Sequence, residues 1–241
     1  MLETNHQDQV IMNNAKVLVY LFFLFCFSIN AQNNTDSLHI NFKVSFNKIP
    51  LELHKQYVSV TNDTVALDIF KCYISSIQIR YADKSVYVEK DSYHLLDLEN
   101  PSSLYIPITP SNDKHITKIS FSIGIDSLTS NSGALTDDLD PTKGMYWAWQ
   151  SGYINMKLEG KSPSCKTRKN QFHFHLGGYL KPYYAMRKVE FDVNTNSNIN
   201  IGIDLAKFFS AIDLAQTNSI MIPGQQAMQL ADVVAKLFYI E

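Results

Sequence analysis

Apolar and polar residues alternate with a period of two along much of this chain of 241 residues. Successive side chains of an extended strand point to opposite faces, so this alternation predicts strands with one buried face. Turns rich in Asn, Ser, Asp and Pro separate the alternating stretches. Many short strands with this spacing predict an all-β fold, an antiparallel β-sandwich with long loops. The alternating stretches are 38–46, 77–81, 119–125, 154–158, 172–176, 189–193 and 199–205.

The end of the chain departs from this pattern. After Pro223-Gly224, apolar residues follow at helical spacing from Ala227 to Phe238, which predicts a short C-terminal helix packed on the sandwich. The chain contains no repeat and no low-complexity linker, so we expect one domain over residues 32–241. Its longest predicted loop, 126–144, has the length of a functional loop.

The first residues have the features of an export signal. Lys16 precedes a 13-residue apolar run, 17–29, and Ala31 supplies a small residue for cleavage. The run is shorter than the ~20 residues that span a bilayer. We therefore expect a signal peptide over 1–31, a mature form without an integral membrane span, and a periplasmic or cell-surface location. A membrane anchor is the alternative; lipidation at Cys26 is disfavoured by the bulky Phe25.

Charge and cysteine content exclude several classes of protein. The net charge of −2 argues against nucleic-acid binding. Three cysteines are too few for a four-thiolate zinc site, and cleavage would remove Cys26. The remaining Cys72 and Cys165 could form a disulfide in an exported protein, or could stay as a buried thiol and a loop thiol.

Both tryptophans of the chain lie in the segment 144–153. If this segment is extended, Met145, Trp147 and Trp149 share one face. Paired tryptophans in a β-protein are commonly core residues or stack on sugars. Met145 could be packing or a soft outer ligand of a metal, and packing is the favoured interpretation.

A second unusual segment, 172–178, contains a His-x-His pair. Alternation buries Phe172, Phe174 and Leu176 and points His173 and His175 the same way, ~7 Å apart along the strand. Two such imidazoles could converge on one metal or face a solvated groove. The lone His39 is a further candidate because it lies on the polar face of its strand. Serine-hydrolase, zincin, P-loop and dinucleotide motifs are all missing.

In combination, these segments resemble the MbnP-like copper-binding family, whose exported members are named for the copper chelator methanobactin. The resemblance is carried by Asp140-Pro-x-x-Gly-Met-Tyr-Trp-Ala-Trp-x-Ser-Gly-Tyr-Ile-Asn155, by Lys157-Leu-Glu-Gly160 and by Phe174-His-Leu-Gly-Gly178. Weaker matches extend it over nearly the whole mature chain: Tyr73-Ile-Ser-Ser-Ile77, Leu95-Leu-Asp97, Phe121–Ser127 and Met221-Ile-Pro-Gly224.

The resemblance implies a β-rich exported protein that binds copper as Cu(I) and is not itself an enzyme. It also implies that one tryptophan, Trp147 or Trp149, is oxidised to kynurenine beside the metal by a di-haem cytochrome c peroxidase-like (MauG-like) partner. His175 matches the Phe-His-Leu-Gly motif of the family. His173 is the next candidate ligand, and His39, then His54, are the choices for a further one. The alternative function is an extracellular β-sandwich that binds a glycan or a protein through its aromatic residues.

Overall fold

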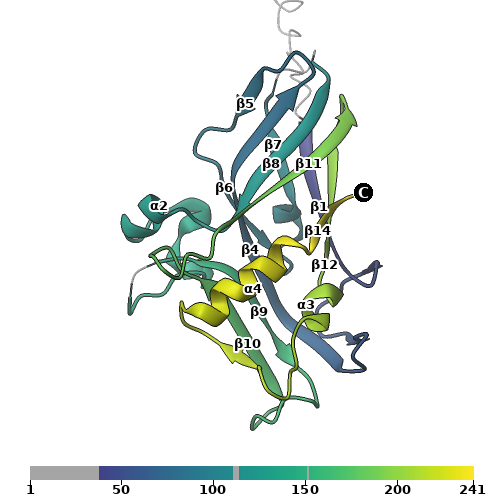
Figure 1. Ribbon diagram of the computed structural model, residues 1–241, viewed down its shortest axis with the longest axis vertical. Helices are drawn as coiled ribbons and strands as arrows, with labels where there is room; N and C mark the ends of the chain where they lie inside the picture. The colour runs from purple at the N-terminus through teal and green to yellow at the C-terminus, as the bar shows by residue number, and fades with distance from the viewer. Residues whose placement is uncertain (1–37, 111–113, 151) are drawn as a thin grey trace, which may run out of the picture. The chain divides into compact units, whose positions relative to one another are not determined.

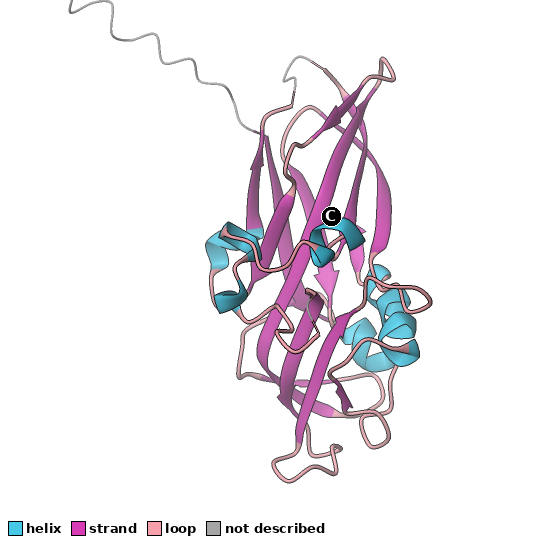
Figure 2. Cartoon of the chain, turned by 90° about the vertical axis from the view of Figure 1, so that its left-hand side faces the viewer, coloured by secondary structure: helices cyan, strands magenta, loops and turns pink. Residues whose placement is uncertain are grey.

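β-Strands dominate the computed structural model, which describes residues 38–110, 114–150 and 152–241 (Figure 1). The predicted signal peptide, 1–31, lies outside the described residues. Within the described residues, no helix is both long enough and apolar enough to cross a membrane. The described residues form one compact unit, and Figure 2 shows how few helices accompany its strands.

The strands form two sheets, which confirms the predicted all-β sandwich. The smaller sheet has the order β14-β12-β1-β2, with β7 also paired to β1. Its strands are β1 (Leu38–Phe46), β2 (Ile49–Pro50), β7 (Tyr105–Ile108), β12 (Ile199–Asp204) and β14 (Phe238–Ile240).

The larger sheet has the order β11-β8-β4-β9-β10-β13, and β3, β5 and β6 also pair with β4. Most pairs are antiparallel as predicted, but β1 with β12 and β10 with β13 are parallel. The strands are β3 (Gln56–Val58), β4 (Thr64–Tyr81), β5 (Val86–Val88), β6 (Tyr93–Asp97), β8 (Ile116–Ile123), β9 (Ile154–Lys161), β10 (Gln171–Gly177), β11 (Arg187–Thr195) and β13 (Ser219–Ile220).

The main hydrophobic core contains the inward-facing residues of both sheets. Phe42 from the smaller sheet packs edge-on against Phe121 from the larger one, with ring centroids 5.8 Å apart. The predicted C-terminal helix is present as α4 (Gln225–Ala235), and its buried face contains Ala227 and Leu230. The helix ends before Phe238, which belongs to β14 instead. A second short helix, α3 (Ala206–Ser210), also contributes to this core.

A second hydrophobic cluster lies outside the main core and combines strand residues with residues of the predicted long loop. That loop contains the short helices α2 (Ser127–Asn131), η3 (Asp137–Leu139) and η4 (Pro141–Lys143); a further one, η2 (Pro101–Leu104), precedes β7. Hydroxyl groups anchor the loop: Tyr73 on β4 donates to the Asp138 carbonyl at 2.8 Å, and Tyr153 donates to the Leu139 carbonyl at 2.9 Å. The cluster is formed by Tyr73, Leu95, Ile125, Leu139, Met145, Trp147, Tyr153 and Ile154.

Candidate metal site

The two histidines of the His-x-His pair lie on β10 and point away from the main core, as the alternation predicts. Phe172, Phe174 and Leu176 on the same strand belong to that core. Across the strand pair, His173 lies opposite Glu159 of β9, and His175 lies opposite Lys157. The three strands β4, β9 and β10 therefore present a polar surface on the side of the sheet that faces away from the core, which we call the outer face.

Glu159 connects the two histidines. Its Oε1 lies 2.6 Å from Nε2 of His175, and its Oε2 lies 3.5 Å from Nδ1 of His173. Lys157 Nζ lies 3.4 Å from the same carboxylate. The hydrogen bond with His175, together with the nearby positive charge of Lys157, lowers the pKa of Glu159 to about 2 despite partial burial. The carboxylate is therefore ionised at neutral pH and holds both imidazoles in place.

This arrangement leaves one nitrogen of each ring without a partner among the described residues: Nδ1 of His175 and Nε2 of His173. A histidine that ligates a metal commonly donates its other ring N–H to a carboxylate, which fixes the ring and increases its basicity. Glu159 is placed for that role. His175 is only 7% exposed, so its ring is held in a largely water-free setting.

Trp147 packs against the same strand as the histidines, two residues beyond His175. Gly177 follows His175 by two residues on β10 and so lies on the same face. A Cβ atom at Gly177 would lie 2.7 Å from the Trp147 ring, which means that the indole rests directly on the strand backbone. Trp147 is buried in the second hydrophobic cluster, and its backbone N–H donates to the Gly152 carbonyl at 2.9 Å.

The other tryptophan is placed differently from the prediction. Residues 148–150 form a turn, so the segment is not extended throughout, and Trp149 does not share a buried face with Trp147. Trp149 is 63% exposed, with its ring centroid 6.4 Å from that of Trp147. Met145 is fully buried in the second cluster, in keeping with the packing interpretation.

The structure does not bring the remaining candidate histidines to this pair. His39 lies on β1 of the smaller sheet, where its backbone N–H donates to Asn198 and its ring meets Tyr105 edge-on. His54 is exposed in the loop before β3, with Nδ1 3.1 Å from Asp68. Neither belongs to the surface formed by Glu159, His173 and His175.

Both cysteines of the predicted domain are free and buried, so the structure does not contain the disulfide that the sequence allowed. Cys72 on β4 lies opposite Met156 of β9, while Cys165 follows the end of β9 at Lys161. Met156 and Lys161 are five positions apart, roughly 17 Å along the strand, which is far beyond the separation of ~7 Å that a disulfide tolerates. Burial raises the pKa of both thiols, that of Cys165 to about 11.

The donor set limits the kinds of metal site that this surface can form. Among the described residues, no group of three or more His, Cys, Asp and Glu side chains is arranged to hold a metal ion. The surface therefore lacks the closed cage of a structural zinc site. Two imidazoles oriented by a carboxylate fit a metal such as copper, which binds imidazole well.

Sequence reasoning missed Glu159, which orients both histidines. Its signal was present, because the predicted strand 154–158 already placed Lys157 on the polar face, and Glu159 is the next residue on that face. The sequence could not show the register between β9 and β10, which places Glu159 opposite His173.

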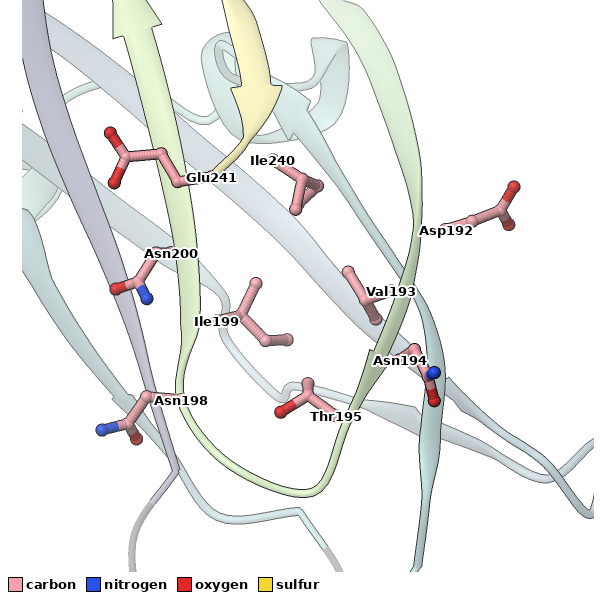
Figure 3. Close-up of a pocket in the computed structure, with 9 residues that line it drawn as sticks. All are labelled: Asp192, Val193, Asn194, Thr195, Asn198, Ile199, Asn200, Ile240 and Glu241. Atoms are coloured by element: carbon pink, nitrogen blue, oxygen red, sulfur yellow. The ribbon is translucent and has the colours of Figure 1, made fainter.

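Two hollows have linings that contain neither His173 nor His175. One, of about 300 Å³, is lined by residues that include Gln150, Leu180 and Tyr183. The other, of about 480 Å³, lies between β11 on one side and β12 and β14 on the other (Figure 3). Asparagine and carboxylate side chains surround its apolar residues, and its lining contains no histidine or cysteine.

Comparison with known proteins places this arrangement in a family. The family model described as MbnP matches residues 35–222. A solved structure, MbnP from Methylosinus trichosporium, superimposes with a TM-score of 0.61 at 13% identity, over 85% of this chain and 97% of that one. At this identity the likeness establishes the fold. No curated protein matches the chain in sequence.

Proposed function

Because the chain belongs to the MbnP family, whose members are associated with methanobactin and with copper, we propose that it is an exported copper-binding protein and not an enzyme. The observation that carries the proposal is the pair His173 and His175, both held by Glu159, with the Trp147 ring resting two residues beyond on the same strand face.

Copper in the Cu(I) state suits this donor set. It is a soft ion that imidazole nitrogens bind well, and copper stands at the top of the divalent affinity order, so cells handle it through dedicated sites. His175 is the first ligand and His173 the second. Glu159 is not itself a ligand of the metal; it sets the orientation and basicity of both imidazole rings.

Trp147 is the residue that we propose to be oxidised to kynurenine. It is buried beside the histidines, whereas Trp149 is exposed and lies farther out, in the turn that follows. Opening of the indole ring releases an aromatic amine, a nitrogen that can approach a metal far better than the indole nitrogen can. The oxidant is hydrogen peroxide, two molecules per tryptophan, used through a di-haem peroxidase-like partner that can withdraw electrons from Trp147 without direct contact between haem and Trp147. The C2–C3 bond of the indole breaks, oxygen is added, C2 leaves as formate, and water is the other product.

Export completes the proposal. The predicted signal peptide would deliver the protein to the periplasm or the cell surface, where it would encounter copper and a haem partner. No nucleophile with an adjacent base was recognised in the sequence, and the described histidines have partners suited to orientation, so the reaction at Trp147 is assigned to the partner.

The proposal is tested by producing the exported protein with and without a di-haem partner from the same genome. The purified protein is analysed for copper content and by mass spectrometry of the peptide that contains both tryptophans. We expect bound copper and, only with the partner, a mass shift on Trp147. The variants Trp147→Phe and Trp149→Phe form a matched pair, in which only the first should abolish the shift. Protein that carries no copper and no modified tryptophan under either condition would contradict the proposal.

A second function is favoured by one observation, the exposure of Trp149, whose sequence neighbour Gln150 lines a hollow together with Leu180 and Tyr183. An exposed aromatic side chain next to such a hollow suits a module that binds a glycan or a protein. This alternative predicts that Trp149→Ala abolishes ligand binding in the absence of any metal. Under the copper-binding function, Trp149→Ala should leave copper binding unchanged, so this variant distinguishes the two functions.

A further inference from the structure

A methionine that the sequence analysis did not connect with the histidines lies on the segment next to them. β13 runs parallel to β10, with Ser219 opposite His173 and Ile220 opposite Phe174. Extending this register by one residue past the end of β13 would bring Met221 opposite His175. Resting on the copper-binding function proposed above, we infer that the Met221 thioether is a ligand of the same metal ion, which forms a site of two histidines and one methionine.

Burial shows which way Met221 faces. Ile220 is 6% exposed and belongs to the main core, like Phe174 opposite it. Met221 is the next residue and is 43% exposed, so it points away from that core. Paired residues of parallel strands share a face, and His175 also points away from the core. Met221 and His175 therefore lie on the same outer face.

A second contact keeps the segment beside β10 after the last hydrogen-bonded pair. A Cβ atom at Gly178, one residue past the end of β10, would lie 3.4 Å from Cβ of Pro223. Ile220, which precedes Met221, lies beside Phe174, and Pro223, which follows it, lies beside Gly178. Both sides of Met221 are therefore held against β10. Because neighbouring strands lie ~4.8 Å apart, a methionine side chain at this position can reach the His175 ring.

The contacts of His175 leave its other side open to such a ligand. Glu159 approaches Nε2 of His175 from β9, while Met221 lies on the opposite flank, along β13. Nδ1 of the same ring is the nitrogen without a hydrogen bond among the described residues. The carboxylate and the thioether thus flank the imidazole from the two strands that neighbour β10, one to orient it and the other to share its metal.

The thioether changes which ions the site prefers. Imidazole serves zinc and copper alike, whereas a thioether sulfur selects Cu(I). The free thiols, also soft donors, are unsuited to the role, because Cys72 points into the main core and Cys165 lies beyond the end of β9. Met221 therefore supplies the soft ligand that makes a pair of histidines specific for a soft monovalent ion.

The test compares the full mature protein with its Met221→Leu variant, with Met228→Leu on helix α4 as the matched control. Leucine keeps the size and apolar character of methionine but removes the sulfur. Affinities for Cu(I), Ag(I) and Zn(II) are measured by competition with chelators. We expect Met221→Leu to weaken Cu(I) and Ag(I) binding at least about tenfold, since even the loss of an outer-shell partner usually costs that much. Zn(II) affinity and the control variant should be unchanged.

A second measurement does not depend on the variant. In the wild-type protein labelled at the methionine methyl groups, the Met221 methyl resonance should move on addition of one equivalent of Cu(I), while that of Met228 stays in place. Wild-type protein that binds Cu(I) with a stationary Met221 resonance and an unaltered affinity in Met221→Leu would overturn this inference alone. Wild-type protein that binds no Cu(I) would overturn the proposed function as well.

Discussion

At the scale of single residues, Glu159 and Gly177 shape the surroundings of the histidines more than any motif does. Glu159 contacts both rings, with its Oε1 2.6 Å from His175. Gly177 has no side chain, and that gap is filled by the Trp147 indole. Glu159 orients the two histidines, and Gly177 leaves room for the Trp147 ring to pack on the strand.

The pairing of Glu159 predicts a distinct dependence of stability on pH. The pKa of Glu159 is lowered from 4.5 to about 2 in the folded protein, so its stabilising contribution is complete above pH 4.5 and is lost as the pH falls towards 2. Glu159→Gln lacks this titration. Thermal unfolding between pH 6 and pH 2 should show the wild-type advantage over Glu159→Gln shrinking across that window. Glu52→Gln, which alters an exposed glutamate, is the control, and a constant difference for Glu159→Gln would contradict the assignment.

Gly177→Ala tests the contact between Trp147 and the strand. The added Cβ would lie 2.7 Å from both the Trp147 ring and the Tyr153 carbonyl oxygen, so the indole must move. We expect a loss of about 1–3 kcal/mol in the free energy of unfolding and a red-shifted tryptophan emission. In the control, Gly224→Ala, the new Cβ meets nothing within 4 Å and the backbone is extended, so little change is expected. Unaltered emission in Gly177→Ala would refute the packing described here.

At the scale of elements, the long loop between β8 and β9 lies against the outer face of the larger sheet and buries Trp147 there. Side-chain hydroxyls fix the loop: Tyr73 from β4 and Tyr153 from the loop's end both donate to η3 carbonyls. The two tyrosine rings also meet edge-on, with centroids 5.8 Å apart. Hydrogen bonds and ring contacts thus fix the long loop, which covers Trp147, to the larger sheet.

Removing one of these hydroxyls should loosen the loop without unfolding the sheet. Tyr73→Phe deletes the 2.8 Å bond to the Asp138 carbonyl. We expect a loss of about 1 kcal/mol in stability and faster amide hydrogen exchange in residues 136–147. Tyr87→Phe is the matched control, because that hydroxyl makes no hydrogen bond among the described residues. Equal exchange in both variants would show that the bond does not restrain the loop.

The elements also show what sequence can and cannot predict. Strict alternation identified β1, β9, β10 and β12, because the apolar side chains on one face of each strand enter the main core. It identified only the end of β4, since the pairing with β9 shifts between Leu67 and Ile69 and interrupts the period. The two-residue β13 is too short to carry any period, so the place of Met221 beside His175 emerged only from the fold. The parallel pairing of β1 with β12 likewise joins segments from opposite ends of the chain.

At the scale of the whole molecule, a continuous core holds both sheets together, and the two cysteines among the described residues form no disulfide. Cys72 and Cys165 are both buried and lie at separate positions along the sheet. The stability of the fold therefore does not depend on an oxidised cysteine pair, even though the protein is proposed to be exported.

Counting free thiols tests directly whether Cys72 and Cys165 are both reduced. Mature protein treated with iodoacetamide without reductant should gain almost no label while folded, because both thiols are buried and their pKa values are raised. In denaturant, still without reductant, both Cys72 and Cys165 should be labelled. Intact mass spectrometry gives the count. A chain that accepts label in denaturant only after reduction would contain a disulfide and contradict the structure.

The central claim is that His173 and His175 form a Cu(I) site in an MbnP-family protein. The most direct measurement is a competition titration of the mature protein with Cu(I), compared with the double variant His173→Ala/His175→Ala and with His94→Ala as control. His94 on β6 pairs with Glu89, which follows β5, and neither residue contacts the histidine pair. We predict tight Cu(I) binding by the wild-type and His94→Ala proteins and its loss in the double variant. Wild-type binding no tighter than millimolar, or equal binding by the double variant, would contradict the claim.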